Sequence, residues 1–248
     1  MKILLCVVIL FSIGRCTDYG AVTLNNYGRE YVNADYRVGN NYSDPITYPC
    51  AVHDTHCIRR FFAQNSRCTP VEGPTPDPYI LKRESHNIPH ANVTLIQRNA
   101  PLQGLHNWKI QEFYINKATD RLVLEVVFDK ITITSQRTTL RFYLKGKEPI
   151  DLTDFATIEY NDVSLTLIIP YLKDIQLSRS HVYTYLPEAL PKFVLGPGLL
   201  KSTDPVVTAS LLTLTGNTPL TIREIYVTQG PLFMSIFFQS TICDFGYY

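Results

Sequence analysis

Cysteine and histidine are the residues of this chain best suited to chemistry, and four of them crowd into one short run. The run consists of Cys50, His53, His56 and Cys57. Thiolates and imidazoles together form a ligand set that suits zinc. The competing chemistry is disulfide formation, because Cys68 follows closely and Cys243 lies near the far end. An even number of cysteines behind an apolar leader is typical of a disulfide framework in an exported protein. We therefore favour disulfides and expect no metal and no cofactor.

A helix predicted from Asp54 to Arg67 limits how these cysteines can pair. Asp54 is a suitable N-cap, because its carboxylate can accept a hydrogen bond from an early backbone N–H. The apolar face at helical spacing consists of Ile58, Phe61, Phe62 and Asn65. Along this helix Cys57 and Cys68 would lie roughly 16 Å apart at ~1.5 Å per residue, beyond the ~7 Å reach of a disulfide. Of the two pairings that remain, we prefer Cys50–Cys57 with Cys68–Cys243, which combines a local loop with a long closing bridge.

The first sixteen residues predict a signal peptide. Lys2 gives a positive start, residues 3–13 form an uncharged apolar core, and small residues follow. Cleavage after Gly14 or Cys16 fits, and we favour Cys16 because four cysteines then remain. The core is shorter than the ~17–25 apolar residues of a membrane helix. We expect a soluble, secreted protein without a membrane anchor.

Charge and motifs exclude several functions. Removing a leader with Lys2 and Arg15 leaves 21 basic against 22 acidic residues, a net charge of −1, which argues against a nucleic-acid partner. The chain has no Gly-x-Ser-x-Gly, no His-Glu-x-x-His and no phosphate loop. We predict that it is not an enzyme. His86 and His90 are expected to be ordinary surface histidines, and the paired acids Asp151 and Asp154 are expected to be solvated loop residues.

Two sequons predict N-glycans. Asn41-Tyr42-Ser43 and Asn92-Val93-Thr94 both match the acceptor pattern, and in a secreted chain such sites lie on the surface. We expect Asn92 and Asn41 to be glycosylated.

Composition divides the mature chain into an arm and one domain. Residues 17–49 are rich in Tyr, Asn and Gly and poor in aliphatic residues, so they lack a core-facing pattern. We predict an extended arm, for which a solvated tail is favoured over an adhesive segment. Residues 50–248 are predicted to form a single domain.

The middle of this domain predicts an antiparallel sheet. Apolar residues alternate over 122–128 and 163–169, the period of a half-buried strand. Ile131 and Ile133 continue on the opposite parity, which suggests a bulge near Lys130. No helix separates these segments, and parallel strands would need crossovers.

Helices are expected to return near the C-terminus. Asp204-Pro205 and Thr218-Pro219 each resemble an N-cap followed by proline. The second helix, over 220–243, is apolar on all sides, so we expect it to be buried against the concave face of the sheet. Gly230-Pro231 should kink or break it. The predicted fold class is α+β: a long curved antiparallel sheet wrapped around a long apolar C-terminal helix, with a short disulfide-pinned helix at the start.

Several short motifs resemble the fibrohexamerin family of silk glycoproteins. The matching stretches are Cys57–Phe62 with Asn65, Ser66 and Cys68, then Pro76–Pro78, Ile88–Thr94, Glu112–Lys117 with Thr119 and Asp120, and Ile242–Gly246. The resemblance implies a secreted partner in the silk-gland lumen. It would bind the heavy and light chains of silk fibroin noncovalently and aid the transport and solubility of the heavy chain. The arm at 17–49 has no counterpart in this resemblance.

A looser likeness to the insect takeout and juvenile-hormone-binding proteins covers the same region. It rests on the early cysteine pair, the sheet-rich middle and the apolar final helix, and it implies the same sheet-and-helix fold. It also implies an alternative function, an extracellular carrier of a small apolar lipid or terpenoid. A carrier would need an unfilled cavity of about 300–1,000 Å³, whereas a partner would need an exposed apolar surface.

Overall fold

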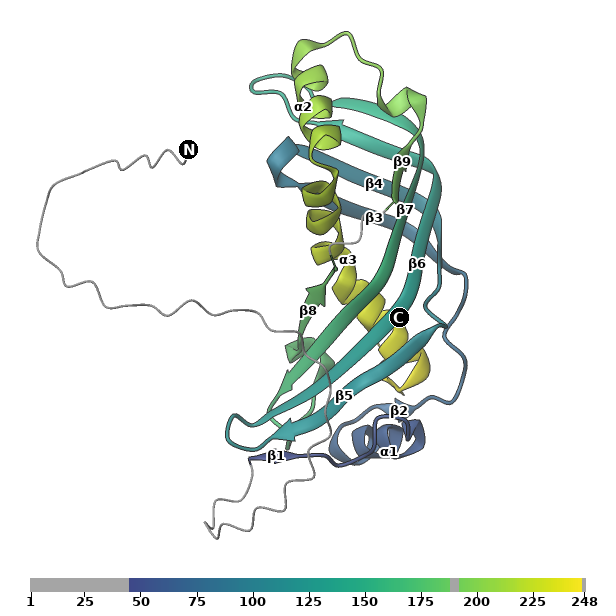
Figure 1. Cartoon of the computed structure of the whole chain (residues 1–248), viewed down its shortest axis with the longest axis vertical. Coiled ribbons are helices and arrows are strands. Elements are labelled where there is room, and N and C mark those ends of the chain that lie inside the picture. Colours follow the sequence, from purple (N-terminus) through teal and green to yellow (C-terminus); the bar gives the residue numbers. More distant parts are fainter. Residues whose placement is uncertain (1–44, 188–191, 247–248) are drawn as a thin grey trace, which may run out of the picture. The chain divides into compact units, whose positions relative to one another are not determined.

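A long antiparallel sheet and one long helix make up most of the molecule (Figure 1). The computed structural model describes residues 45–187 and 192–246. The predictions for the signal peptide, for Asn41 and for most of the arm lie outside the described residues. The elements are, in order, β1 (Ile46–Thr47), α1 (Thr55–Asn65), β2 (Thr69–Pro70), β3 (Tyr79–Ile88), η1 (Pro89–Ala91), β4 (Val93–Gln103), β5 (Trp108–Asn116), β6 (Arg121–Phe142), β7 (Ile150–Pro170), η2 (Leu177–Arg179), β8 (His181–Tyr185), β9 (Lys192–Leu195), η3 (Pro197–Leu199), α2 (Pro205–Gly216), α3 (Thr218–Thr241) and β10 (Cys243–Asp244).

The sheet is built around one long hairpin, β6 and β7. The two strands pair along almost their whole length, from Arg121 with Pro170 to Phe142 with Ile150. One edge of β6 carries β5 and then β4, and β1 and β3 lie beyond these two strands. The far edge of β7 carries β8 and then β9. All of these pairs are antiparallel, as predicted.

The predicted alternation is confirmed on both long strands. Leu122, Leu124, Val126 and Phe128 are buried, and so are Val163, Leu165, Leu167 and Ile169. Beyond these residues the buried positions switch from even to odd numbers on β6, where Ile131 is buried, and from odd to even numbers on β7, where Tyr160 is buried. The two switches lie opposite each other in the sheet. The two changes compensate, so Phe128 pairs with Val163 and Lys130 with Asn161 in unbroken register.

The prediction of a bulge near Lys130 is therefore wrong. The register of β6 and β7 shifts further along, between Ser135 and Thr138. At the expected position β7 instead contains Asp162 with a φ of 50°, and a positive φ lets a non-glycine strand residue reverse its facing. These irregularities accompany the strong bend of both strands that is visible in Figure 1.

The helices begin at the predicted caps, with one adjustment. Asp54 accepts a hydrogen bond from the Cys57 backbone N–H at 2.9 Å, and Asp204 accepts from Val206 at 2.9 Å. For α3 the cap is Asn217 rather than Thr218. The helix continues through Pro231 to Thr241, so of the predicted kink or break at Gly230-Pro231 the break does not occur.

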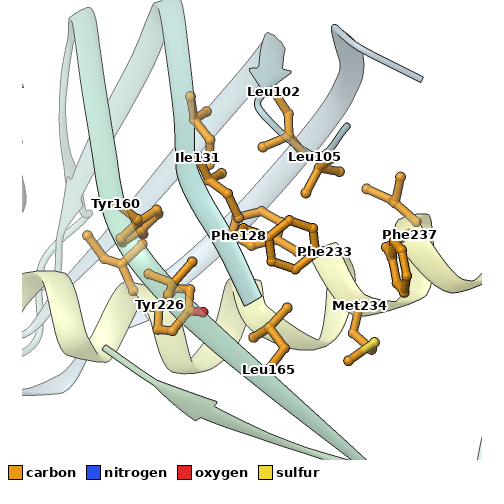
Figure 2. Packing of buried hydrophobic residues seen from close by; sticks show 14 of the residues in the cluster. Leu102, Leu105, Phe128, Ile131, Tyr160, Leu165, Tyr226, Phe233, Met234 and Phe237 are labelled. Atoms are coloured by element: carbon orange, nitrogen blue, oxygen red, sulfur yellow. The ribbon is translucent and has the colours of Figure 1, made fainter. Parts of the chain in front are cut away.

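The core lies between α3 and the concave face of the sheet (Figure 1). Figure 2 shows side chains of α3, β6 and β7 filling this space. Phe128 and Phe237 pack edge to face with ring centroids 5.9 Å apart, and Phe233 and Met234 are fully buried. Each buried side chain of this size contributes roughly 1.5–3 kcal/mol. The prediction of an apolar helix buried by the sheet is confirmed.

One glycine sets how closely α3 approaches β8. A Cβ atom on Gly230 would overlap the Thr184 methyl group and would meet Leu165 at 3.0 Å. Because glycine has no Cβ, the helix backbone can lie directly on these two strands. This contact fixes the edge of the sheet against the centre of α3.

Candidate functional site

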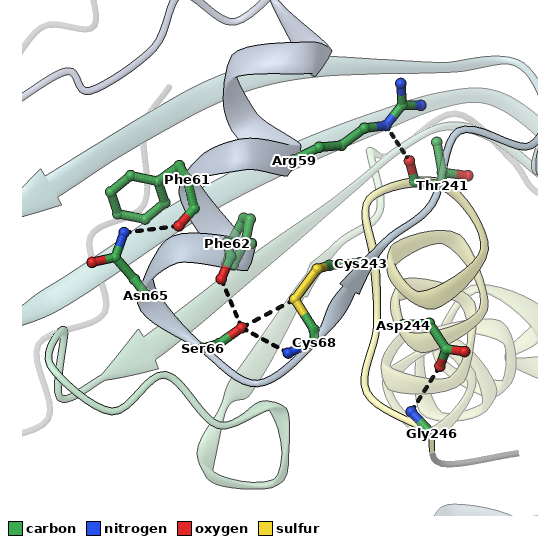
Figure 3. The surroundings of a disulfide bond; sticks show 10 residues. All are labelled: Arg59, Phe61, Phe62, Asn65, Ser66, Cys68, Thr241, Cys243, Asp244 and Gly246. Atoms are coloured by element: carbon green, nitrogen blue, oxygen red, sulfur yellow. Dashed lines mark hydrogen bonds between the residues drawn. A yellow bond between two sulfur atoms is a disulfide. The ribbon is translucent and has the colours of Figure 1, made fainter.

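Two disulfides join the start of the folded chain to its end. Cys50 is bonded to Cys57, and Cys68 to Cys243 across 175 residues; these are the pairs expected from the sequence. Figure 3 shows the second bridge beside the last turn of α1. The Ser66 hydroxyl donates to the Phe62 carbonyl at 2.7 Å, and Arg59 Nε donates to the Thr241 carbonyl at 2.8 Å. The N-terminal helix is thereby fixed to the C-terminal end of α3.

The same bridges remove the zinc ligands that the sequence could have offered. The sulfur atoms of Cys50 and Cys57 are bonded to each other, so neither is a thiolate. His56 instead lies 3.0 Å from Arg60 and 3.9 Å from Glu72.

His86 is buried in a polar chain under α3, so its prediction as a surface histidine is wrong. The chain begins at Tyr160, whose hydroxyl donates to Gln229 Oε1 at 2.6 Å. Gln229 Nε2 lies 3.2 Å from His86 Nε2, and His86 Nδ1 lies 2.9 Å from the Thr228 hydroxyl. An amide N–H must donate to an acceptor, so this geometry suits a neutral imidazole with its proton on Nδ1. Burial lowers the pKa of His86 to about 4.

His90 is also engaged with α3 rather than free on the surface. Its Nδ1 lies 2.7 Å from Glu224 Oε2, and its Nε2 lies 3.2 Å from the Thr221 hydroxyl. Both histidines of the β3–β4 hairpin therefore attach the sheet to α3. Their role in the fold is structural.

The two aspartates predicted as solvated loop groups both lie on β7. Asp151 pairs with Arg141 at 2.7 Å, and this hydrogen bond lowers the pKa of the Asp151 carboxyl. Asp154 accepts a hydrogen bond from the Gly198 N–H at 2.6 Å. A Cβ at Gly198 would lie 2.8 Å from that carboxylate, so glycine is needed for the approach. Both acids hold structure in place.

Large side chains fill the centre of the core, and a pocket lies to one side of it. Large buried rings such as Phe128, Tyr160 and Phe233 fill the centre (Figure 2). A pocket of about 470 Å³ lies between β8, η2 and the second half of α3. Its walls include Leu167, Leu177, Val182, Pro231 and Met234. Its size is within the range of small-molecule sites.

Tyrosines stand out on the opposite, outward face of the sheet. Tyr183 and Tyr185 on β8 are 60% and 64% exposed, and Tyr48 is 67% exposed and packs against Tyr114. Between them, one cross-strand row runs from Tyr114 through Val123 to Ile168. We call this set the aromatic face, and it consists of Tyr48, Tyr114, Val123, Val127, Ile168, Tyr183 and Tyr185. Of this set Tyr48, Tyr183 and Tyr185 are exposed and the other four side chains are half-buried, and Glu112 pairs with Glu125 on the same face between Val123 and Val127. Exposed aromatic groups mark binding surfaces.

Asn92 lies in the tight connection between β3 and β4. It is exposed, has a φ of 52°, and its amide donates to the Tyr143 carbonyl at 3.2 Å. A surface turn suits a glycan acceptor. The occupancy of this sequon stays a prediction.

Comparison with known proteins assigns the chain to a family. The sequence profile of the Fibroin P25 family matches residues 46–247. This protein belongs to the Fibroin P25 family. It is also 26% identical to Fibrohexamerin of Galleria mellonella over 207 residues, which cover 81% of this chain and 89% of that protein. The resemblance found in the sequence motifs is thus confirmed, and the family match includes all four paired cysteines.

Comparison with solved structures gives a weaker similarity. Takeout 1 of Epiphyas postvittana superimposes with a TM-score of 0.48 and 14% identity, over 78% of this chain and 93% of that one. A likeness of this degree carries no conclusion about ligands of the Fibroin P25 member described here.

The features that sequence reasoning missed are the His86 chain and the aromatic face. The run from His181 to Tyr185 carried a signal, since its alternation places Tyr183 and Tyr185 on one face of a strand. No such local signal exists for the His86 chain, because its members come from three separate elements, β3, β7 and α3.

The beginning of the folded unit also differs from expectation. Ile46 and Thr47 form β1, which pairs with Asn116 and Ile115 of β5. The Pro45 carbonyl accepts a hydrogen bond from the Lys117 N–H at 2.8 Å. The last residues assigned to the arm therefore belong to the sheet. None of the helices in the described ranges is long and apolar enough to cross a membrane.

Proposed function

We propose that this protein is a secreted silk glycoprotein that associates noncovalently with the heavy and light chains of silk fibroin. It aids their transport, solubility and assembly in the lumen of the silk gland. Membership of the Fibroin P25 family carries the proposal. In this function the chain is a binding partner rather than an enzyme, and it uses no cofactor.

The cysteines support a noncovalent mode of association. Within residues 45–187 and 192–246, every cysteine is in an intramolecular disulfide. A paired set leaves no thiol in this region for a bond to another chain. Association then depends on surface contacts, for which shape, apolar area and hydrogen bonds supply the affinity.

The aromatic face is the surface that we assign to the silk partner. Tyr183 and Tyr185 project from β8, whose only strand partner in the described part of the chain is β7. A strand with a free edge can accept an extended segment of another chain by backbone hydrogen bonds. Neighbouring tyrosines offer large contact area at low entropic cost, as they do at other interfaces.

The proposed complex is tested by release under two conditions. Complex from gland lumen, or from cells that secrete this protein with fibroin chains, is treated with urea with or without reductant. We expect urea alone to release the protein, because no covalent bond holds it. Release only with reductant would show an intermolecular disulfide and would refute the noncovalent mode.

The assignment of the surface is tested by substitution. Tyr183→Ser with Tyr185→Ser should weaken the complex by roughly 10-fold or more, since central interface tyrosines contribute about 1–2 kcal/mol each. Leu212→Ser on α2 is the matched control, because Leu212 is 68% exposed and lies outside the aromatic face. Equal affinities of the double variant and the control would place the partner elsewhere.

The pocket beside β8 supports a second function, the carriage of a small apolar ligand. Its volume of about 470 Å³ would hold a lipid or terpenoid. Native mass spectrometry of the protein purified without detergent tests this directly. A carrier would show a bound small molecule that Val182→Phe removes, whereas the silk function requires none.

A further inference from the structure

Three arginines lie side by side across the outward face of the sheet, far along β6 from the aromatic face. Arg83 of β3 is the cross-strand partner of Arg98 of β4, and Arg98 is the partner of Arg137 of β6. All three are exposed. We infer that this arginine row is a docking site for an acidic segment of the silk partner, an inference that rests on the proposed function for the identity of that partner.

No acid among the described residues forms an ion pair with the row. The ion pairs of that part of the chain involve other cations, namely His56, His90, His106, Lys109, Lys130, Arg141 and Arg179. The adjacent outward row consists of Ser85, Ile96 and Thr139, none of which is charged. Glu84, next to Arg83, is half-buried, and burial raises the pKa of its carboxyl. Three positive charges therefore face solvent together.

The backbone that carries the row is irregular but firmly held. The register of β6 with β7 shifts between Ser135 and Thr138, and Arg137 lies within the shifted segment. The buried Ser135 hydroxyl donates to the Arg98 carbonyl at 3.4 Å and accepts from the Arg137 N–H at 3.3 Å. One hydroxyl thus ties together the strands of two of the three arginines. Bulges commonly re-aim a side chain at functional surfaces.

Protection of a sheet edge does not explain the row. Charged residues on an edge strand prevent pairing with other chains, and this accounts for Arg83 on β3. Arg98 and Arg137 lie on β4 and β6, each of which has a strand on both sides. Like charges directly opposite each other destabilise a sheet. Their alignment on inner strands therefore needs a compensating role, which a bound anion provides.

The spacing suits a short stretch of acidic polypeptide. Strands lie ~4.8 Å apart, so the row spans roughly 10 Å, the length of about three residues of extended chain at ~3.3 Å each. Guanidinium groups bind carboxylates through paired hydrogen bonds. A membrane would need a broader positive surface than one row flanked by uncharged residues. We therefore commit to a segment with two or three acidic residues close together.

Peptide binding tests the site without the whole partner. A fluorescein-labelled hexaglutamate peptide is titrated with the purified protein at low salt, and a hexaglutamine peptide serves as the ligand control. We expect binding of the acidic peptide only, a reduction of roughly 10-fold or more in Arg98→Gln, and weakening as salt rises. Arg67→Gln removes the same charge from an exposed position outside the row and should leave binding unchanged.

Folding is checked in the same samples. Because Arg98→Gln relieves like-charge repulsion, its melting temperature should equal or exceed that of the wild type. Equal loss of binding in Arg98→Gln and Arg67→Gln would overturn the site. So would binding to vesicles with anionic lipid, lost in Arg98→Gln, in the absence of peptide binding.

The complex with fibroin chains separates this inference from the proposed function. If the complex forms equally well with Arg98→Gln, the arginine row is not its docking site and the proposed function stands. If no complex forms with wild-type protein while the acidic peptide binds, the proposed function fails and the row binds a different acidic partner.

Discussion

The two disulfides differ in loop length, and this difference sets a large and measurable difference in stability. Cys68–Cys243 closes a loop of 175 residues, whereas Cys50–Cys57 closes one of 7. In the chain-entropy description, a disulfide removes unfolded-state freedom that grows with the logarithm of loop length, which gives about 5 kcal/mol for the long loop and about 2 kcal/mol for the short one. The double replacement Cys68→Ala with Cys243→Ala should therefore cost about 3 kcal/mol more than Cys50→Ala with Cys57→Ala.

Local contacts around the two disulfides also make the loss of the long bridge more costly than the loss of the short one. Cys68 and Cys243 are both buried, and the β2–β10 pairing holds Cys243 opposite Pro70. Cys50 is buried, while Cys57 is half-buried at the start of α1. Removal of the long bridge loses buried packing in addition to the loop constraint, whereas removal of the short bridge leaves the Asp54 cap in place.

Urea denaturation of the wild type and of the two double variants gives the comparison. A loss of about 5 kcal/mol is a large part of the 5–15 kcal/mol that a domain possesses, so the long-bridge variant is measured in the cold and by protease susceptibility as well. Equal losses, or a larger loss for the short bridge, would refute the argument from loop length. Peptide mapping that recovered a Cys57–Cys68 link would refute the pairing itself.

Three further predictions concern single residues. The pKa of His86 is about 4 in the folded protein and about 6.5 in the unfolded chain, so the unfolded state binds more protons between these pH values. The free energy of unfolding should therefore fall by about 3 kcal/mol as pH drops from 6.5 to 4. His86→Gln should abolish this pH dependence, whereas His90→Gln should leave it in place. Gly230→Ala should destabilise by about 1–3 kcal/mol through overlap with Thr184, and Thr184→Ser, which lacks the overlapping methyl, should restore most of it in urea melts. Asn92→Gln should increase the gel mobility of the protein by as much as enzymatic removal of the glycan at Asn92 does. An unchanged mobility would show that this sequon carries no glycan.

The sheet and the helices were predictable because their signals are local. Alternation over 122–128 and 163–169 follows from the two-residue period of a strand, and aspartate followed by proline marked the start of α2 at Asp204. The prediction of a bulge near Lys130 was wrong. A change in which residues of β6 face the core is matched by the same change on β7 at Asp162, so the pairing of the two strands stays in register there. Sequence shows the parity of each strand but not the pairing that decides between these outcomes.

Pro231 and His86 show the limits of local reasoning in another way. Proline removes one helical hydrogen bond, yet α3 is buried along most of its length, and this packing outweighs the loss. His86 looked exposed because Pro89 and several polar residues surround it in the sequence. Its burial follows from Thr228 and Gln229, which lie more than 140 residues away. Contacts of that separation are not readable from a single sequence.

The filled core and the joined ends determine where a partner can act. A core closed by rings such as Phe128 and Phe237 resists opening, because well-packed interiors lose contacts with small displacements. The Cys68–Cys243 bridge also prevents the N-terminal helix from separating from the end of α3. Binding must therefore use the existing outer surface, where the aromatic face and the arginine row lie 10 residues apart along β6 between Val127 and Arg137, or roughly 33 Å of strand at ~3.3 Å per residue. A short peptide cannot reach both regions, but a long silk chain can, and two weak contacts on one chain raise each other's effective concentration. Under the proposed function, apolar contact would supply affinity and the arginines would supply steering and specificity.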